Sequence, residues 1–469
     1  MIQRLLLLII IPIQLLFAQN YGSLRIANYA DDRHGAFSFT FDDGLKSQFD
    51  YAKPVLDQYD FKGTFYVLPP YLVRDNDSTI WRYGRWNEFQ QMAAEGHEIG
   101  SHTMNHDTLT FLSWGDDLTP GTLLYELHQS KLSIEQKIPD KSCISLNYPY
   151  TIHNSIVDSA ASLFYENGRT GGEAPNDSSL SGKEWYKLKA KEIKFNDPRD
   201  SVNSDLDELY AFLNWLKSAI DSHKWGIIII HDVVPFNQLQ ELLDNDVYEP
   251  VTTEWFGWLC DFLFTKSTSK DVWIATVGNV NRYIKEREHA SYKIISSSDQ
   301  LIEINLTDDL DDEIYNYPLS AYVNIPAEWN YVRTEQNGKI DTLTTMLTDS
   351  GRVVLTKVVP NNGNLRITPI IATDVKNEIK SVSVYHLFQN YPNPFNPSTK
   401  ISWQTPVNGR QTLKVYDILG NEVVTLIDEE KLAGNYELNF DAGKLCSGIY
   451  YYQLRAGNFV ETKKMILLK

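Results

Sequence analysis

The chain contains the segment Phe37-Ser38-Phe39-Thr40-Phe41-Asp42-Asp43-Gly44, whose apolar residues alternate like those of a β-strand and then stop at two adjacent carboxylates and a glycine. Neighbouring carboxylates repel each other and are costly to dehydrate. A buried strand that leads into such a pair therefore usually has a cation or a proton beside it. An ordinary Asp-Gly turn after a strand is the alternative interpretation.

A pair of histidines follows in Gly96-His97-Glu98-Ile99-Gly100-Ser101-His102-Thr103-Met104-Asn105-His106. His102 and His106 stand at positions i and i+4, which one helical turn would place on the same face. Two imidazoles and a carboxylate make the three-ligand set of a catalytic zinc site, which keeps one position open for water. A surface pair, or polar histidines satisfied in the core, is the alternative.

Expected strands alternate with expected helices from residue 36 to about residue 287. We expect strands at 36–41, 63–68, 97–100, 144–148, 227–230 and 272–275, and helices at 86–95, 123–137, 155–165 and 204–222. This order predicts a parallel sheet covered by helices, either as a barrel or as an open sheet. Chemistry gathers at the C-terminal strand ends of barrels, and Asp42, Asp43, Tyr150 and His231 all follow such an end.

These segments resemble the polysaccharide deacetylases of the NodB homology type, carbohydrate esterase family four. The resemblance covers residues 25–288 and implies a distorted (β/α) barrel of about seven strands. Its motifs, in chain order, are Thr40-Phe41-Asp42-Asp43-Gly44, His102-Thr103-Met104-Asn105-His106, Tyr148-Pro149-Tyr150 and Ile227-Ile228-Ile229-Ile230-His231.

The resemblance implies a role for each matched residue. Asp43, His102 and His106 would hold a divalent metal; zinc suits these ligands best, and cobalt or manganese fit similar sites. Asp42 would be the general base, and His231 the general acid that protonates the leaving amine. The backbone N–H of Tyr150 would stabilise the oxyanion.

The sequence departs from the family pattern in two places. Asn147 stands where the family has an arginine that steadies the catalytic carboxylate, and a neutral amide cannot clamp a carboxylate as arginine does. The Asp and Trp of the family's fourth motif, which orient the acid histidine, have no recognisable counterpart. Lost activity, a variant site, or an arginine from elsewhere would each explain this. Our candidate supplier is Arg169 in a glycine-rich loop, with a solvated loop arginine as the alternative.

Residues 1–18 have the pattern of a signal peptide, because Arg4 precedes an apolar run and the small residue Ala18 follows it. The run is too short to span a bilayer, and no later segment is long and apolar enough for a transmembrane helix. The net charge of −18 argues against nucleic acid and anionic membranes as partners. Cys143 and Cys260 are the cysteines that fall within one expected domain and could pair.

The C-terminal third is expected to consist of two all-β, sandwich-like modules. Short alternating strands predict an accessory module over residues 292–373, whose aromatic residues favour core packing over a sugar-binding face. Residues 374–386 have the composition of a linker. Residues 387–469 resemble the C-terminal sorting domain of the type IX secretion system, through Tyr391-Pro392-Asn393-Pro394-Phe395, Val415-Tyr416-Asp417-Ile418-Leu419-Gly420 and Gly448-Ile449-Tyr450.

The sorting resemblance implies the type IX secretion machinery as a partner and a protein that is released or held at the cell surface. We therefore expect an exported, metal-dependent hydrolase that removes N-acetyl or O-acetyl groups from a polysaccharide containing N-acetylglucosamine. A hydrolase of another non-peptide C–N bond and a catalytically silent glycan-binding protein are the alternatives. The sequence leaves the polymer and the oligomeric state open.

Overall fold

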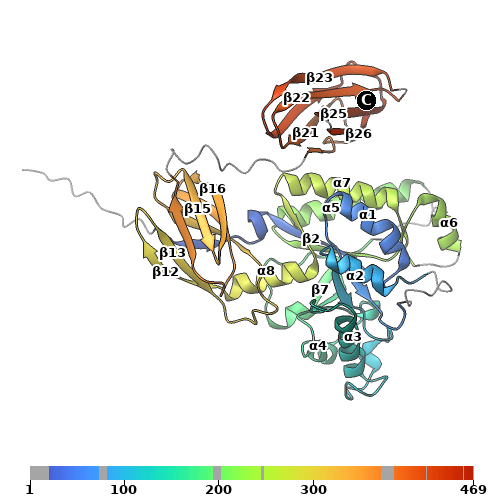
Figure 1. Cartoon of the computed structure of the whole chain (residues 1–469). Coiled ribbons are helices and arrows are strands. Elements are labelled where there is room, and N and C mark those ends of the chain that lie inside the picture. The colour runs from blue at the N-terminus through green and yellow to red at the C-terminus, as the bar shows by residue number, and fades with distance from the viewer. Residues whose placement is uncertain are drawn as a thin grey trace, which may run out of the picture.

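The computed structural model describes residues 21–72, 82–193, 202–244, 248–370, 385–393, 395–418, 420–457 and 459–467, without the side chains of 202–210 (Figure 1). The predicted signal peptide and residues 374–384 of the predicted linker lie outside these residues. Among the described residues, no helix combines the length and the apolar character needed to cross a bilayer.

Seven parallel strands close into a barrel, which confirms the predicted fold. They pair in sequence order, and β8 returns to β2. An eighth strand, β11 (Val272–Ile274), pairs with the first half of β2, whereas the second half pairs with β3. This division distorts the barrel at β2. The barrel strands are β2 (Gly35–Phe41), β3 (Thr64–Val67), β4 (Glu98–Ser101), β5 (Ser145–Asn147), β6 (Asn167–Gly171), β7 (Leu188–Glu192) and β8 (Trp225–Ile230).

Helices cover the outside of the barrel. The four consecutive isoleucines of β8 fit this arrangement. Ile228 and Ile230 pack in the core between the strands and the helices, whereas Ile227 and Ile229 pack in the core inside the barrel. A strand buried on both faces is apolar at every position. The helices are α1 (Lys53–Gln58), α2 (Trp86–Ala94), α3 (Leu123–Lys137), α4 (Ser155–Ala161), α5 (Val202–Asp221), α6 (Phe236–Asp244), α7 (Thr253–Thr268) and α8 (Val277–His289); β9 (Val233–Val234) and β10 (Val251–Thr252) form a small parallel pair.

Helix α8 begins at the N-terminal mouth of the barrel. The backbone N–H of Val277 donates to Thr64 Oγ1 at 2.9 Å, and that of Gly278 donates to Glu98 Oε2 at 2.7 Å. Thr64 and Glu98 are the first residues of β3 and β4. The start of α8 therefore lies at the end of the barrel opposite the strand ends that carry Asp42 and His231.

The accessory module follows α8 and shares its core with the barrel interior. Its first sheet includes β1, which precedes the barrel in sequence and pairs with β14. Trp329 and Tyr315 are 3% and 5% exposed, so they pack in the core as expected. The sheets run β1 (Leu24–Ile26), β14 (Leu319–Ile325), β18 (Gly351–Val358), β17 (Met346–Thr348), and β12 (Ser291–Ser297), β13 (Ile302–Thr307), β19 (Leu365–Pro369), β15 (Tyr331–Gln336), β16 (Lys339–Thr344).

The C-terminal module is a two-sheet β-structure with its own core, which includes Trp403, Val415 and Tyr452. It forms a separate lobe beside α7 (Figure 1). The sheets run β20 (His386–Leu387), β21 (Ser398–Thr405), β24 (Gly434–Asp441), and β23 (Glu422–Lys431), β22 (Gly409–Tyr416), β25 (Gly448–Ala456), β26 (Phe459–Leu467).

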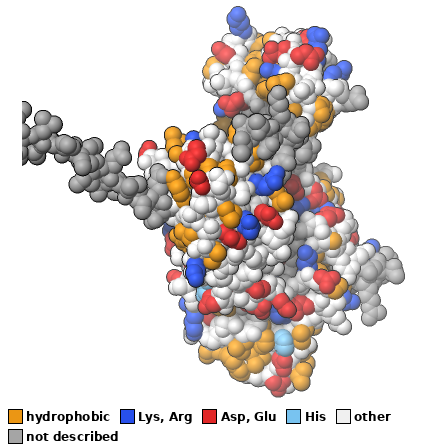
Figure 2. Space-filling model, turned by 60° about the vertical axis from the view of Figure 1, so that its left-hand side comes forward, with side chains coloured by type: hydrophobic (Ala, Val, Ile, Leu, Met, Phe, Trp, Pro, Cys, Tyr) orange, Lys and Arg blue, Asp and Glu red, His pale blue; other side chains and the backbone are white. Residues whose placement is uncertain are grey.

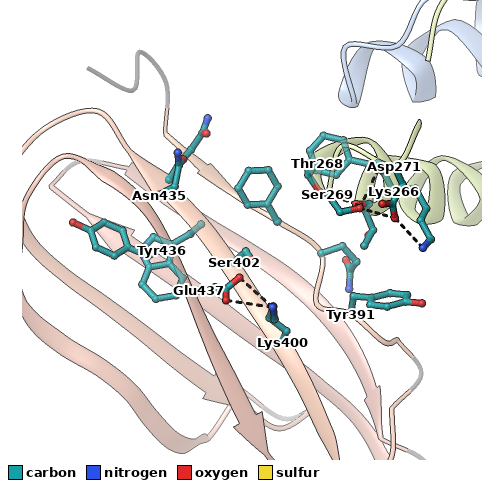
Figure 3. Close-up of a pocket in the computed structure, with 16 residues that line it drawn as sticks. Lys266, Thr268, Ser269, Asp271, Tyr391, Lys400, Ser402, Asn435, Tyr436 and Glu437 are labelled. Carbon is teal, nitrogen blue, oxygen red and sulfur yellow. Dashed lines mark hydrogen bonds and ion pairs between the residues drawn. The ribbon is translucent and has the colours of Figure 1, made fainter. Parts of the chain in front are cut away.

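A cavity of about 820 Å³ lies between α7 and this lobe (Figure 3). Its charged side chains are paired, Lys266 with Asp271 at 3.1 Å and Lys400 with Glu437 at 3.2 Å. None of the predicted site residues lines it. The cavity therefore belongs to the contact between modules and not to the candidate active site.

Candidate active site

The predicted site residues converge at the C-terminal mouth of the barrel. Asp42 and Asp43 follow β2, His102 and His106 follow β4, and His231 follows β8. The backbone of the mouth is tied together by Gln48, whose Nε2 donates to the carbonyl of Asp42 at 2.5 Å and to that of His231 at 3.1 Å. Gln48 thus joins the ends of two neighbouring strands directly beneath the site.

Three side chains form a cluster that could hold a metal ion. Asp43 Oδ1 lies 3.5 Å from His102 Nε2 and 3.8 Å from His106 Nε2, and the two Nε2 atoms are 3.2 Å apart. The spacing of the two histidines suggested a helix, but they do not lie on one. They lie in a loop in which His106 and Thr103 adopt left-handed backbone conformations, with φ of 62° and 70°.

The state of His102 fits metal binding. Its Nδ1 lies 3.1 Å from the carbonyl oxygen of Asn147, a bond that places the proton on Nδ1 and leaves Nε2 as a ligand. Burial lowers the pKa of His102 to about 4, against the opposing effect of Asp42 and Asp43, so the ring is neutral near pH 7. One carboxylate and two imidazoles converging within 4.8 Å suit a divalent ion such as zinc.

Asp42 is buried beside a cation. Its Oδ2 accepts a hydrogen bond from Arg169 Nη2 at 2.5 Å, and His231 Nε2 lies 3.9 Å from the same oxygen. Burial by itself would raise the pKa of Asp42, but Arg169, with His102 and His231, lowers it below its ordinary value. The carboxylate is therefore ionised and able to accept a proton.

Arg169 lies in β6 and not in a solvated loop. It is fully buried, and its guanidinium lies 5.3 Å from the centroid of the Tyr66 ring. In the β5–β6 pairing Arg169 is directly opposite Asn147. The Nδ2 of Asn147 lies 3.3 Å from His102 Nε2. The structure therefore brings an arginine to Asp42 from the strand next to Asn147.

Tyr150 lies in a tight turn after β5, η4 (Pro149–Thr151). Tyr150 and Thr151 both have left-handed backbones, with φ of 57° and 59°. Such conformations cost about 1 kcal/mol or more for residues other than glycine and persist where neighbouring contacts impose them. Thr170 Oγ1 supplies one such contact by donating to the Thr151 carbonyl at 2.7 Å. The Tyr150 ring packs edge-on against His106, with centroids 4.6 Å apart.

Glu126, a buried residue of α3, fixes the histidine loop and was not among the residues predicted from the sequence. Its Oε2 accepts the backbone N–H of Met104 at 3.1 Å and of Asn105 at 2.7 Å, and its Oε1 accepts Asn105 Nδ2 at 2.6 Å. These bonds hold the chain between His102 and His106. The signal in the sequence is only a glutamate on the buried face of an amphipathic helix.

Exposed apolar side chains gather at one end of the molecule (Figure 2). Figure 2 shows hydrophobic side chains clustered at the lower end of the molecule, where Figure 1 has α3 and α4. The loop that joins β4 to α3 has two large exposed apolar side chains, Phe111, which is 87% exposed, and Trp114, which is 43% exposed. On the same view, acidic and basic side chains are interspersed rather than gathered by sign.

Two family models match this sequence. Residues 30–167 match the polysaccharide deacetylase model, and residues 389–468 match the secretion system C-terminal sorting domain. The chain thus contains one segment that matches polysaccharide deacetylases and a C-terminal segment that matches secretion-sorting domains. Both resemblances are thereby confirmed. The sorting domain indicates export by the type IX system to the cell surface or the medium.

Similar proteins include a gellan lyase from Bacillus sp, which is 27% identical over 368 residues. That match covers 76% of this chain and 14% of the gellan lyase, so the chain spans about a seventh of that relative's length. Similar solved structures are the Streptococcus pyogenes deacetylase PplD in complex with acetate (23% identical, 33% of this chain and 63% of that chain, TM-score 0.27) and the Xyl-CE4 domain of a multidomain xylanase from the hindgut metagenome of Trinervitermes trinervoides (18% identical, 51% and 97%, TM-score 0.28).

Proposed function

We propose that this deacetylase domain is metal-dependent and hydrolyses N-acetyl groups of a glycan that contains N-acetylglucosamine, with O-acetyl groups as the other option. The observation that carries the proposal is that the Asp43, His102 and His106 cluster lies beside Asp42, which is buried between Arg169 and His231. This is the arrangement of a metal site with an adjacent base and acid.

Asp43, His102 and His106 would hold the ion, which when bound supplies a Lewis acid for the acetyl carbonyl and lowers the pKa of water. Asp42 takes a proton from the attacking water, and Arg169 keeps Asp42 ionised beforehand. The water oxygen bonds to the acetyl carbon, the C–N bond breaks, and His231 gives its proton to the leaving nitrogen. The backbone N–H of Tyr150 donates to the carbonyl oxygen as negative charge develops on it. The products are acetate and the free amine.

We propose a catalytic region at 25–288, an accessory module at 292–373, a linker at 374–386 and a sorting domain at 387–469, after a signal peptide at 1–18. The pairing of β1 with β14 and the core shared with the accessory module support assaying the catalytic region together with that module.

The competing functions are a hydrolase of another non-peptide C–N bond and a silent glycan-binding protein. The buried ion pair between Arg169 and Asp42 favours an active enzyme over the silent protein, because a charged pair is costly to bury. The choice of amide substrate rests on the deacetylase family match.

The test is acetate release by the mature chain, residues 19–469, from acetylated chitooligosaccharides, peptidoglycan and xylan, with a chelator and with added zinc. We expect release that the chelator abolishes, that zinc restores, and that Asp42→Asn lacks. Bound metal without acetate release would point to another amide substrate. Neither metal nor release would favour the silent binding protein.

A further inference from the structure

The candidate acid His231 contacts a tyrosine from the segment that follows α6. The ring centroids of His231 and Tyr248 are 5.0 Å apart and their planes are inclined by 83°, an edge-to-face arrangement. Tyr248 is itself 53% exposed. An exposed ring keeps a fixed place only if another contact holds it, and Tyr248 has such a contact.

Glu192 is that contact. The hydroxyl of Tyr248 donates to Glu192 Oε1 at 2.6 Å. Glu192 is the last residue of β7 and lies opposite Ile229 of β8, two positions before His231. The carboxylate, the tyrosine and the histidine therefore form a chain across the ends of two neighbouring strands. Burial, with the hydrogen bond to Glu192, raises the pKa of Tyr248. The hydroxyl therefore stays protonated and remains the donor in this hydrogen bond.

The imidazole needs an orienting contact. Asp42 Oδ2 is 3.9 Å from His231 Nε2, beyond hydrogen-bond distance, so this carboxylate alone does not fix the ring. The last torsion of a histidine side chain has broad, two-fold preferences. A general acid must nevertheless point its proton at the leaving group.

We propose that Tyr248, anchored by Glu192, positions the imidazole of His231 for proton donation to the leaving nitrogen. The inference rests on the proposed function and adds two positioning residues to it. Neither residue touches the reacting atoms in this role. Each acts on the one step in which the C–N bond breaks and the amine takes the proton of His231.

Two substrates of different leaving group separate this role from a general structural one. Release of an amine from an acetylated chitooligosaccharide needs the proton, whereas release of 4-nitrophenolate from 4-nitrophenyl acetate does not. We expect Tyr248→Leu to lower kcat for the amide by about tenfold or more, a fraction of what a general acid contributes. The same variant should hydrolyse the aryl ester at close to the wild-type rate.

Conservative variants grade the effect. Tyr248→Phe keeps the ring and loses the bond to Glu192, so its amide rate should lie between those of wild type and Tyr248→Leu. Glu192→Gln keeps an acceptor oxygen and should retain most of the rate. Tyr292→Leu, at an exposed tyrosine of β12 in the accessory module, is the matched control. Thermal unfolding and bound zinc are measured for every variant.

Equal losses on both substrates would overturn the inference, as would a higher KM with kcat unchanged, which would make Tyr248 a sugar-binding surface. If Tyr248→Leu does not fold, the same comparison is made with Tyr248→Phe, and an unchanged amide rate in that variant overturns the proposed anchor. If the wild type cleaves neither substrate, the proposed function itself fails and the inference with it.

Discussion

Replacing Arg169 by methionine tests whether this arginine of β6 keeps the general base Asp42 ionised. Methionine keeps a long unbranched side chain and removes only the guanidinium. In the wild type, Nη2 of Arg169 and Oδ2 of Asp42 are 2.5 Å apart, with side-chain exposures of 0% and 6%. Removing one partner of a buried ion pair costs about 3 to 5 kcal/mol, because the other charge is left buried.

Asp42 can avoid part of this cost by taking up a proton. Burial already favours its neutral form, and Arg169 is the largest influence in the opposite direction. A protonated Asp42 cannot accept the proton of water. We therefore expect kcat/KM for acetate release to fall by about 100- to 10,000-fold, the usual contribution of a general base. Zinc content should stay near one ion per chain, because the ion pair of Arg169 is with Asp42 and not with a proposed metal ligand.

Two double variants sharpen the test. In the Asp42→Asn background, Arg169→Met should cause little further loss of rate and a smaller loss of stability than in the wild type, because the carboxylate that pairs with Arg169 is already absent. In the Arg169→Asn background, Asn147→Arg should restore part of the rate, because the two positions are opposite each other on β5 and β6. Wild-type turnover in Arg169→Met with zinc bound would refute the role of Arg169, and the rate would then be independent of the ion pair.

Three further predictions concern the framework around the site. Burial first, then Asp308 and Asp312, raise the pKa of Glu286 to about 8, against Arg282 and the backbone N–H of Tyr317 that lower it. Because this folded pKa exceeds the unfolded value of 4.5, the stabilisation is full below that value and is lost as the pH rises through about 8. The Tm should therefore fall between about pH 4.5 and about pH 8, and Glu286→Gln should flatten the profile; an unchanged slope would contradict the shift. Deleting residues 21–26 removes the pairing of β1 with β14 and should lower the Tm of the barrel and accessory module by about 5 °C or more, whereas deleting the separately cored residues 387–469 should change it much less. Glu126→Ala frees the backbone between His102 and His106 and should lower zinc content by mass spectrometry, while Glu135→Ala on the same helix should not; equal zinc in both would show that the loop holds its shape without Glu126.

Much of the site could be predicted from local sequence. Asp42, Asp43 and His231 directly follow β2 and β8, strands of strongly apolar residues whose ends are readable from the pattern. The histidine pair was predicted to be close in space, although the helix expected from its spacing is a loop in which Glu126 holds the backbone. What these residues share is that their positions depend on the nearest few residues of chain.

The tertiary structure decided what depends on pairing between distant segments. The strand β6, Asn167–Gly171, contains two glycines and lacks the apolar alternation of a strand, so the sequence predicted a loop where Arg169 lies. The strand β7, Leu188–Glu192, alternates only over Leu188 and Ala190, which is too short a pattern to predict a strand. They form strands because their backbones hydrogen-bond to β5 and β8 and close the barrel, and side-chain pattern carries little of that information.

The same reason explains β1 and Tyr248. The strand β1 precedes the barrel in sequence yet completes a sheet built from residues 319–358. No local sequence pattern predicts this pairing. Tyr248 reaches Glu192 across 56 residues of chain. The sequence by itself determined the alternation of strands and helices, the two family resemblances and the motif residues at strand ends, because each of these can be recognised in contiguous residues. The cation beside Asp42 and the ring beside His231 were decided by closure of the barrel, because only closure brings the ends of β2, β6, β7 and β8 together.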